Sequence, residues 1–127
     1  PNIVSVSSIL GGNAGFNLSN TLTATLITVD AEKLVKINRI TCANVDGSSS
    51  ADLDLFIDGL GSGASGVTTT GADATVYLAK TVAVPADTTL VVLDTPIYLM
   101  EGDILKGGAS ANGDLDLFVS YEVLDDA

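Results

Sequence analysis

Apolar and polar residues alternate along much of this chain with the two-residue period of a β-strand. The clearest stretch is 52–58, Asp-Leu-Asp-Leu-Phe-Ile-Asp, which places two Leu and one Ile on one face and three Asp with Phe56 on the other. The pentapeptide Asp-Leu-Asp-Leu-Phe returns at 114–118, where the alternation continues to residue 123 and puts Phe118 on the polar face. Both copies therefore predict half-buried strands.

Weaker patterns of the same kind predict strands elsewhere, with 30–35 as a helical turn or a loop. Between Ile37 and Ile40 the alternation changes phase, which indicates a β-bulge or burial on both faces. Turn residues separate the runs, among them Gly11-Gly12-Asn13, and Asn112-Gly113 is typical of a β-hairpin. The further predicted strands lie at about 3–9, 21–29, 34–44, 75–84, 89–93, 97–100 and 104–110.

Eight or nine short strands separated by regular turns predict an all-β fold, an antiparallel β-sandwich of the jelly-roll kind. Residues 1–20 are expected to form an N-terminal arm with the first strand, and 21–127 a single sandwich domain. The stretch 59–73 is rich in Gly, Ser and Thr, so we expect an exposed loop there.

Composition narrows the function classes. The formal net charge is −11, from sixteen acidic and five basic residues. This charge repels phosphate backbones, which excludes nucleic acid as the expected partner. A basic partner, bound Ca²⁺ or simple solubility each fit the acidity, and solubility is favoured. No apolar run reaches membrane-span length and no secretory signal opens the chain. The leading Pro suggests a trimmed initiator Met, so we expect a whole chain made in the cytoplasm.

The residues needed for common catalysis are scarce. There is no histidine, which removes Ser-His-Asp and Cys-His mechanisms and His-bound metals. Cys42 is the one cysteine and stands in an apolar run, so a buried, inert thiol is expected. The sequence therefore predicts no enzyme, no catalytic or metal-binding residue and no cofactor.

Three patterns that resemble functional motifs favour a structural interpretation. Residues 61–66 match G-x-G-x-x-G, but no helix pattern follows, as a dinucleotide site requires. The carboxylate pairs of the two pentapeptides lack the buried acid and aromatic platforms of a glycosidase. Calcium has no matching loop motif, and turn residues would be its best ligands: Asp46, Asp87 or Asp103.

Phe56 and Phe118 are notable because strict alternation places both aromatic side chains on the polar, solvent-facing side of their strands. Each either packs against a loop or sheet edge, or is buried in a subunit interface, where aromatic residues are enriched. We expect a loop or a neighbouring subunit to cover at least one of them.

From about residue 34 to the end, the chain resembles small β-sandwich virion proteins of tailed bacteriophages, of the kind that decorate capsids or join tail structures. Three segments carry the resemblance: KINRITCANVDGSSSADLDLFIDG, YLAKTVAVPADTTLVVLDTPIYLMEGDIL and GGASANGDLDLFVSYEVL. The resemblance implies a non-enzymatic homo-oligomer, often a trimer, that binds a capsid or tail through loops and an N-terminal arm. It carries over no single functional residue.

The expected function is that of a capsid decoration (cement) protein on the outer surface of the virion, bridging subunits of the major capsid protein. The alternatives are a tail or neck accessory protein, or a carbohydrate- or receptor-binding module. Binding is expected through apolar contacts and strand pairing at exposed edges. The predicted interface residues are Ile3, Val4, Val6, Ile9, Leu10, Phe56 and Phe118.

Overall fold

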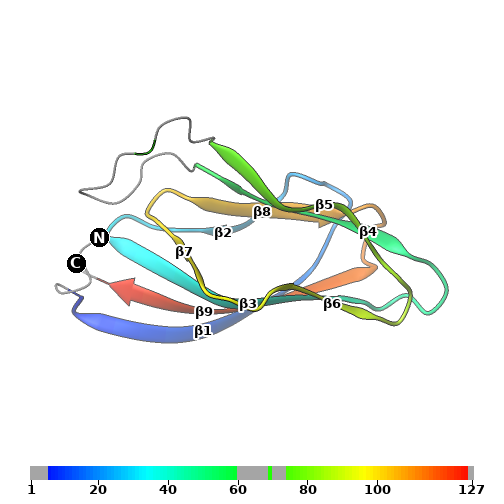
Figure 1. Ribbon diagram of the computed structural model, residues 1–127, viewed down its shortest axis with the longest axis horizontal. Coiled ribbons are helices and arrows are strands. Elements are labelled where there is room, and N and C mark those ends of the chain that lie inside the picture. The colour runs from blue at the N-terminus through cyan, green and yellow to red at the C-terminus, as the bar shows by residue number, and fades with distance from the viewer. Residues whose placement is uncertain (1–5, 60–68, 70–73, 126–127) are drawn as a thin grey trace.

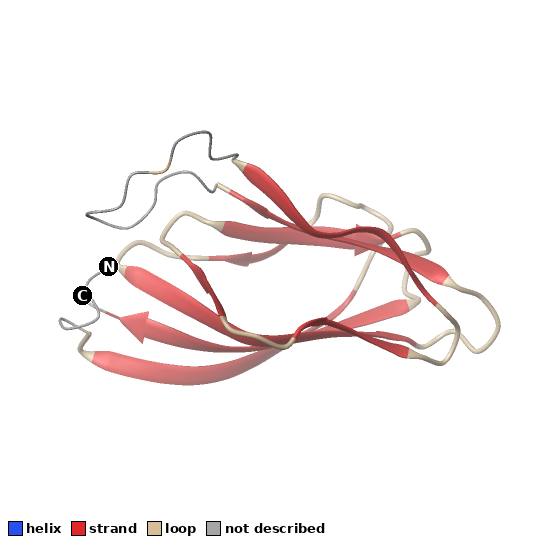
Figure 2. Ribbon diagram, in the orientation of Figure 1, coloured by secondary structure: helices blue, strands red, loops and turns tan. Residues whose placement is uncertain are grey.

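A computed structural model describes residues 6–59, 69 and 74–125 of the 127-residue chain. These residues form nine β-strands and no helix (Figure 2). The all-β prediction is confirmed. The strands are β1 (Ser8–Asn17), β2 (Thr25–Thr28), β3 (Lys33–Asn44), β4 (Ala51–Asp58), β5 (Thr75–Val84), β6 (Thr89–Leu93), β7 (Ile97–Leu99), β8 (Ile104–Ala109) and β9 (Leu115–Asp125).

The strands form two sheets that lie one above the other (Figure 1). The lower layer has the order β1-β9-β3-β6, with β7 also paired to β3, and the upper layer has the order β2-β8-β4-β5. Every pairing among the described strands is antiparallel: β1 with β9, β2 with β8, β3 with β6, β7 and β9, and β4 with β5 and β8. The strands of the first half of the chain, β1 to β4, thus pair with strands of the second half, β5 to β9, in both sheets. This arrangement is the predicted jelly roll.

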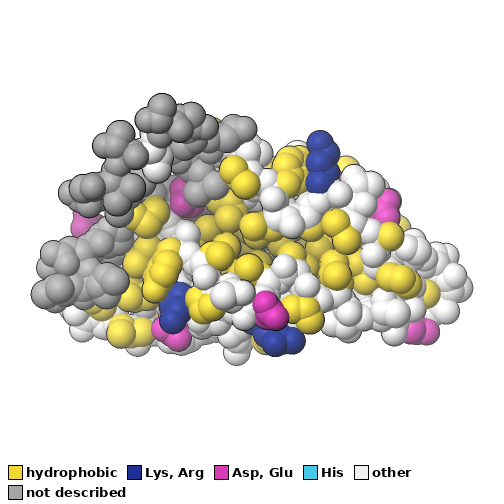
Figure 3. Space-filling model, in the orientation of Figure 1, with side chains coloured by type: hydrophobic (Ala, Val, Ile, Leu, Met, Phe, Trp, Pro, Cys, Tyr) yellow, Lys and Arg dark blue, Asp and Glu magenta, His cyan; other side chains and the backbone are white. Residues whose placement is uncertain are grey.

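The core lies between the layers and consists of the apolar positions that alternation predicted. Leu53, Leu55 and Ile57 of the first pentapeptide strand are at most 5% exposed, and Leu115, Leu117 and Val119 of the second at most 1%. The two copies lie in opposite sheets and face each other's layer, since β4 belongs to the upper sheet and β9 to the lower. Hydrophobic side chains also gather between the layers along the face seen in Figure 3.

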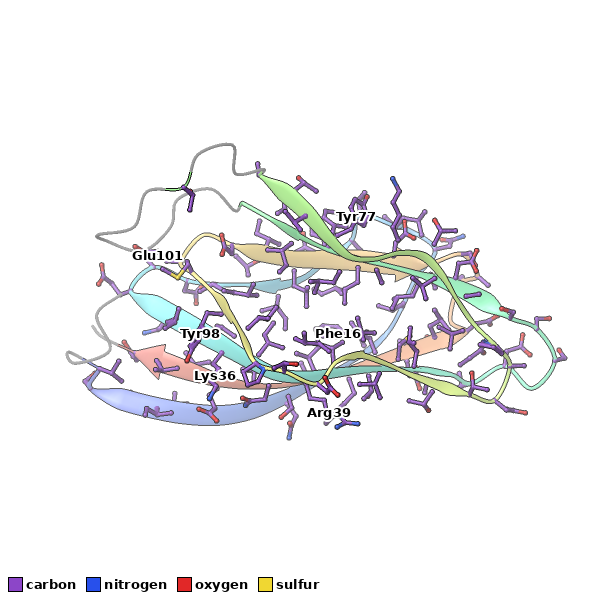
Figure 4. All side chains as sticks on the ribbon, viewed as in Figure 1. Phe16, Lys36, Arg39, Tyr77, Tyr98 and Glu101 are labelled. Atoms are coloured by element: carbon purple, nitrogen blue, oxygen red, sulfur yellow. The ribbon has the colours of Figure 1, made fainter. Side chains whose placement is uncertain are left out.

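The predicted phase change in 34–44 is confirmed. The pairing of β3 with β9 shifts between Ile37 and Arg39, so one extra residue enters β3 there. Ile37 and Ile40 can both face the core as a result, and each is 0% exposed. Figure 4 shows Arg39 on the lower layer, whereas Phe16 lies between the layers.

Two sequence predictions were wrong. Gly11-Gly12-Asn13 is not a turn but lies inside β1, which runs from Ser8 to Asn17 in place of a strand at 3–9. Pairing with β9 along the whole of β1 supplies the hydrogen bonds that offset the low strand propensity of glycine. Asn112-Gly113 does form a turn, with Gly113 at φ 83°. It joins β8 of the upper sheet to β9 of the lower sheet, and these two strands do not pair with each other, so the predicted hairpin is not formed.

Candidate subunit interface

Strand β1 is a long edge strand that lacks the features which usually prevent an edge from pairing with another molecule. It pairs with β9 over ten consecutive residues without a register shift, and no other described strand pairs with it. Its sequence, SILGGNAGFN, contains no charged residue and no proline. A long, regular, uncharged edge exposes backbone groups that another chain can pair with.

The other sheet edges carry the protective features that β1 lacks. β2 has four residues and a register shift against β8. β5 is interrupted by two register shifts against β4, carries Lys80, and has Thr81 in the left-handed region at φ 52°. β6 and β7 have five and three residues. Short length, bulges and lysine are the usual means of preventing pairing between molecules, so β1 is the edge left open.

Large apolar side chains lie at the start of this open edge. Ile9 is 63% exposed and Leu10 is 58% exposed, the two highest values among the exposed large hydrophobic residues. Val6 is partly buried in the segment before β1. Two further residues of the predicted interface, Ile3 and Val4, lie outside the described residues. The described part of the N-terminal prediction therefore lies on or beside β1.

The upper sheet stops short of β1. Leu10 shares the inward face of the lower sheet, yet more than half of its side chain is exposed. Beside it, a cavity of about 180 Å³ opens between the layers. Its walls come from β2 and the following turn, from β3 and from β9: Ile27, Thr28, Val29, Asp30, Lys33, Val35, Tyr121 and Val123.

Glycines give β1 its particular shape. A Cβ at Gly12 would lie 2.9 Å from Cζ of Tyr121, so the tyrosine ring lies directly against the backbone of the edge strand. At Gly11 and Gly15 an added Cβ would meet no atom within 4 Å. The outer face of β1 is therefore bare at these two positions.

Phe118 stands next to this bare strand. It is 49% exposed on the outer face of the lower sheet, with Gly15 opposite it on β1 and Thr41 opposite it on β3. Glycine offers no side chain to cover the ring. The predicted outward orientation is therefore found, and the exposed ring lies beside the second half of β1, whereas Ile9 and Leu10 lie at its start.

Phe56 has a different environment, although it ends the same pentapeptide. It is 5% exposed, because Tyr77 lies opposite it on β5 with the ring centroids 4.9 Å apart. Nζ of Lys80 in turn lies 5.1 Å from the centroid of the Tyr77 ring. Figure 4 places Tyr77 on the upper layer. Phe56 is thus covered within the chain by a neighbouring strand and has little surface left for a partner.

Cys42 and Asp116 are ionisable groups that lie beside β9 and on it, respectively. Burial, followed by the charge of Asp116, raises the pKa of the Cys42 thiol to about 11, so the thiol stays protonated. The predicted buried cysteine is confirmed. Asp116 is held at the surface by Asn17, whose Nδ2 donates to Oδ1 of Asp116 at 2.7 Å.

Two turn aspartates interact at one end of the sandwich. The backbone N–H and the hydroxyl of Ser48 both donate to Oδ1 of Asp46, at 2.9 and 3.1 Å, and hold the pKa of Asp46 below its usual value. Burial and then the charge of Asp46 raise the pKa of Asp114. Asp114 is therefore the member of this pair that takes up a proton first as the pH falls.

Neither a metal centre nor a membrane-spanning helix occurs in the described part of the chain. Within residues 6–59, 69 and 74–125, no group of three or more His, Cys, Asp or Glu residues is placed to hold a metal ion. No helix in those ranges is long and apolar enough to cross a membrane. The G-x-G-x-x-G sequence at 61–66 and most of the predicted loop 59–73 lie outside the described residues.

The middle of β1, residues 11–15, is a strand that the predicted turn at Gly11-Gly12-Asn13 does not anticipate. A signal was present, because Leu10, Ala14 and Phe16 occupy alternate positions together with Gly12, and all four turn toward the core side. Glycine at two consecutive positions hid this alternation.

Comparison with known proteins identifies no relative. No protein-family model matches the sequence, and no curated protein does. Two crystal structures of a pentameric capsid protein isolated from metagenomic phage sequences are similar over 92% of this chain, with 17% and 16% identity and TM-scores of 0.37 and 0.33. The crystal structure of the infectious bursal disease virus VP2 subviral particle is similar over 91%, with 16% identity and a TM-score of 0.38.

The chain spans 60%, 64% and 31% of the length of these three proteins. TM-scores this low mean that the chain paths diverge over much of their course. The similarity therefore assigns this protein to no family.

Proposed function

We propose that this chain is a non-enzymatic structural protein of a tailed-phage virion, and specifically a capsid decoration (cement) protein. In this role it lies on the outer surface of the shell and bridges neighbouring subunits of the major capsid protein. The observation that carries the proposal is the open edge of β1, with Ile9 and Leu10 exposed along it. An edge of this kind favours association by strand pairing and apolar contact.

Two further observations support an assembly role. The three segments that resemble phage virion proteins occupy β3, β4 and the strands from β5 to β9, so the resemblance rests on the framework of the sandwich. The net charge of −11 also disfavours contact with DNA. A homotrimer is the oligomer that the resemblance implies.

Cryo-electron microscopy of particles from the virus that encodes this chain tests the proposal. We expect density for the jelly roll on the outside of the capsid, in hundreds of copies per particle, with β1 at a contact. Density on the tail or neck in a few to a few dozen copies would replace decoration by the accessory role. A chain absent from the particle would refute both, and binding on a glycan array would then favour a receptor-binding module.

A further inference from the structure

The free backbone groups of β1 can be assigned residue by residue. The backbone N–H of Leu18 donates to the carbonyl oxygen of Leu115 at 2.9 Å, in the same register as the whole of β1. Hydrogen-bonded pairs alternate along an antiparallel ladder, so the even-numbered residues of β1 bond to β9. The N–H and C=O groups of the odd-numbered residues then point away from the sheet: Ile9, Gly11, Asn13, Gly15 and Asn17.

We propose that β1 pairs with β1 of a second copy of this chain, antiparallel and about a two-fold axis at Gly12. This inference deepens the proposed assembly role by naming the partner of the same edge. In this register Ile9 lies opposite Gly15 of the second copy, and Gly11 opposite Asn13. All these residues have free backbone groups, so each pair exchanges hydrogen bonds. The two lower sheets join into one.

The side chains of β1 fit this register because large residues meet small ones. Its large exposed residues, Ile9 and Leu10, stand at the start of the strand, and its small residues, Ala14 and Gly15, stand near the end. Antiparallel pairing brings the two ends together, so Leu10 lies opposite Ala14 of the second copy. Both halves of the contact come from the same ten residues, which is the requirement for an isologous two-fold interface.

The outer face shows the same complementarity. Gly15 leaves open space where its Cβ would be, and Phe118 flanks that space at 49% exposure. Ile9 of the second copy enters the space and packs against Phe118. The contact is repeated across the axis. The pairing thus covers Ile9 and Phe118 on the outer face and Leu10 on the inner face.

Charge also points to a second copy rather than to a basic partner. β1 contains no charged residue, so the contact itself brings no like charges together. The remaining repulsion comes from the net charge of −11 on each copy, and salt screens it. Self-pairing therefore strengthens as salt concentration rises, whereas binding of a basic protein would weaken.

This contact is two-fold, so by itself it produces a dimer. A trimer, as the resemblance implies, would have to form through another surface, and β1 pairs would then connect one trimer to the next. The dimer contact can be tested in solution without any capsid. Its failure is thus distinguishable from failure of the decoration role, which particle imaging decides.

Disulfide trapping tests the register. Leu10 and Ala14 of the two copies form a pair without hydrogen bonds, with Cα atoms about 4.5 Å apart. That spacing lies within the range of about 4.4–6.8 Å that disulfides span. The native Cys42 is buried and does not interfere. We expect an oxidised mixture of Leu10→Cys and Ala14→Cys chains to give a covalent dimer, and each variant alone to stay monomeric on a non-reducing gel.

A matched variant excludes other registers. Asn13→Cys alone would cross-link if the axis passed through Asn13, and that result would overturn the register proposed here. Absence of a covalent dimer from the mixture, or equal cross-linking of each variant alone, would overturn the pairing.

Amide hydrogen exchange on the unmodified chain provides a second measurement that needs no variant to fold. We expect exchange at Gly11, Asn13 and Gly15 to slow several-fold as protein concentration rises. Exchange at Gly12 and Ala14, which already bond to β9, should stay slow throughout. Rates at the odd-numbered positions that are independent of concentration would contradict self-pairing.

Discussion

Phe56 and Phe118 end identical pentapeptides, and their environments differ through the residue opposite each of them. Tyr77 faces Phe56 and covers its ring, whereas Gly15 faces Phe118 and leaves half of that ring exposed. The same pentapeptide thus ends in a covered aromatic ring on one sheet and in an exposed ring on the other. Cross-strand neighbours, which lie far apart in the sequence, therefore determine which aromatic ring is exposed and able to contact a partner molecule.

Asp103 is the residue whose charge is worst matched to its surroundings. It is 1% exposed, its Oδ2 accepts from the backbone N–H of Met100 at 2.9 Å, and its Oδ1 has no hydrogen-bond partner among the described residues. Burial raises the pKa of Asp103 above its usual value. The native state therefore binds the proton of the Asp103 carboxyl more tightly than the unfolded state does. The stability that this proton contributes is largest at low pH and is lost as the pH rises through the native pKa of Asp103.

Asp103→Asn removes this charge and keeps an acceptor for Met100. We expect the variant to be more stable than the unmodified chain at pH 7, with a difference that shrinks toward pH 4. Urea unfolding at a series of pH values measures it. A variant that is less stable at pH 7, or a difference independent of pH, would contradict the account of this carboxyl.

Gly107 marks a close approach of two strands. A Cβ at this position of β8 would overlap the backbone carbonyl oxygen of Asp54 on β4, which cannot move without breaking the sheet. We expect Gly107→Ala to lower the free energy of unfolding by about 1–3 kcal/mol. Gly47→Ala is the control, because its Cβ would lie 3.7 Å from the nearest atom, a carboxylate oxygen of Asp87. Equal urea midpoints for the two variants would show that the strands are not so close.

At the scale of elements, the second Asp of the first pentapeptide shapes strand β5. Oδ1 of Asp54 accepts from the backbone N–H of Thr81 at 2.8 Å, where Thr81 has φ 52° and the register of β4 and β5 shifts. The carboxylate thus satisfies a backbone group that the bulge takes out of the ladder. Asp54 is accordingly 9% exposed, unlike a purely solvent-facing residue.

Replacing Asp54 tests this interpretation. Asp54→Ala leaves the Thr81 N–H without its partner, and we expect a loss of about 1–3 kcal/mol in unfolding free energy. Asp52→Ala, two residues earlier in the same motif, should stay within about 0.5 kcal/mol of the unmodified chain. Thermal or urea unfolding compares the two variants. Similar losses for both would indicate that the bulge does not depend on Asp54.

The sequence largely predicts which segments form strands and which of their side chains face the core, because the alternation of apolar and polar residues reflects burial directly. Leu53, Leu55 and Leu117 lie in the core as the pattern indicated, and the phase change at Ile37–Ile40 marks a real register shift. The middle of β1 gives only a weak signal, the alternation of Leu10, Ala14 and Phe16, because the strand depends on the ladder with β9 more than on its own glycine-rich residues. The Asn112-Gly113 turn has the local chemistry of a hairpin, and local chemistry does not distinguish strands that pair from strands that cross between sheets.

The candidate interface was predictable only in part. Ile9 and Leu10 are predicted interface residues because they are apolar and near the start of the chain; both lie exposed on β1, and their role in an interface stays a prediction. The importance of the backbone edge could not be read from the sequence, because it depends on which strands remain unpaired or protected after folding. Phe56 could not be separated from Phe118 for the same reason.

The molecule as a whole is a jelly roll whose described strands leave one unprotected edge. Three edges are short, bulged or marked by lysine, and the fourth is long, regular and uncharged. A single unprotected edge among the described strands of an acidic chain directs association to one place, which fits the proposed assembly role.

The mass of the purified protein in solution tests this central claim most directly. The account predicts a particle larger than the 12.8 kDa of one chain, twice that mass if β1 pairs alone, and a larger associated fraction at higher salt. Leu10→Lys should weaken association about 10-fold or more by placing a charge in the contact. Val91→Lys, at an exposed position on β6 at the far edge of the same sheet, should leave association unchanged. A stable monomer at every protein and salt concentration, or dissociation caused by Val91→Lys and not by Leu10→Lys, would contradict it.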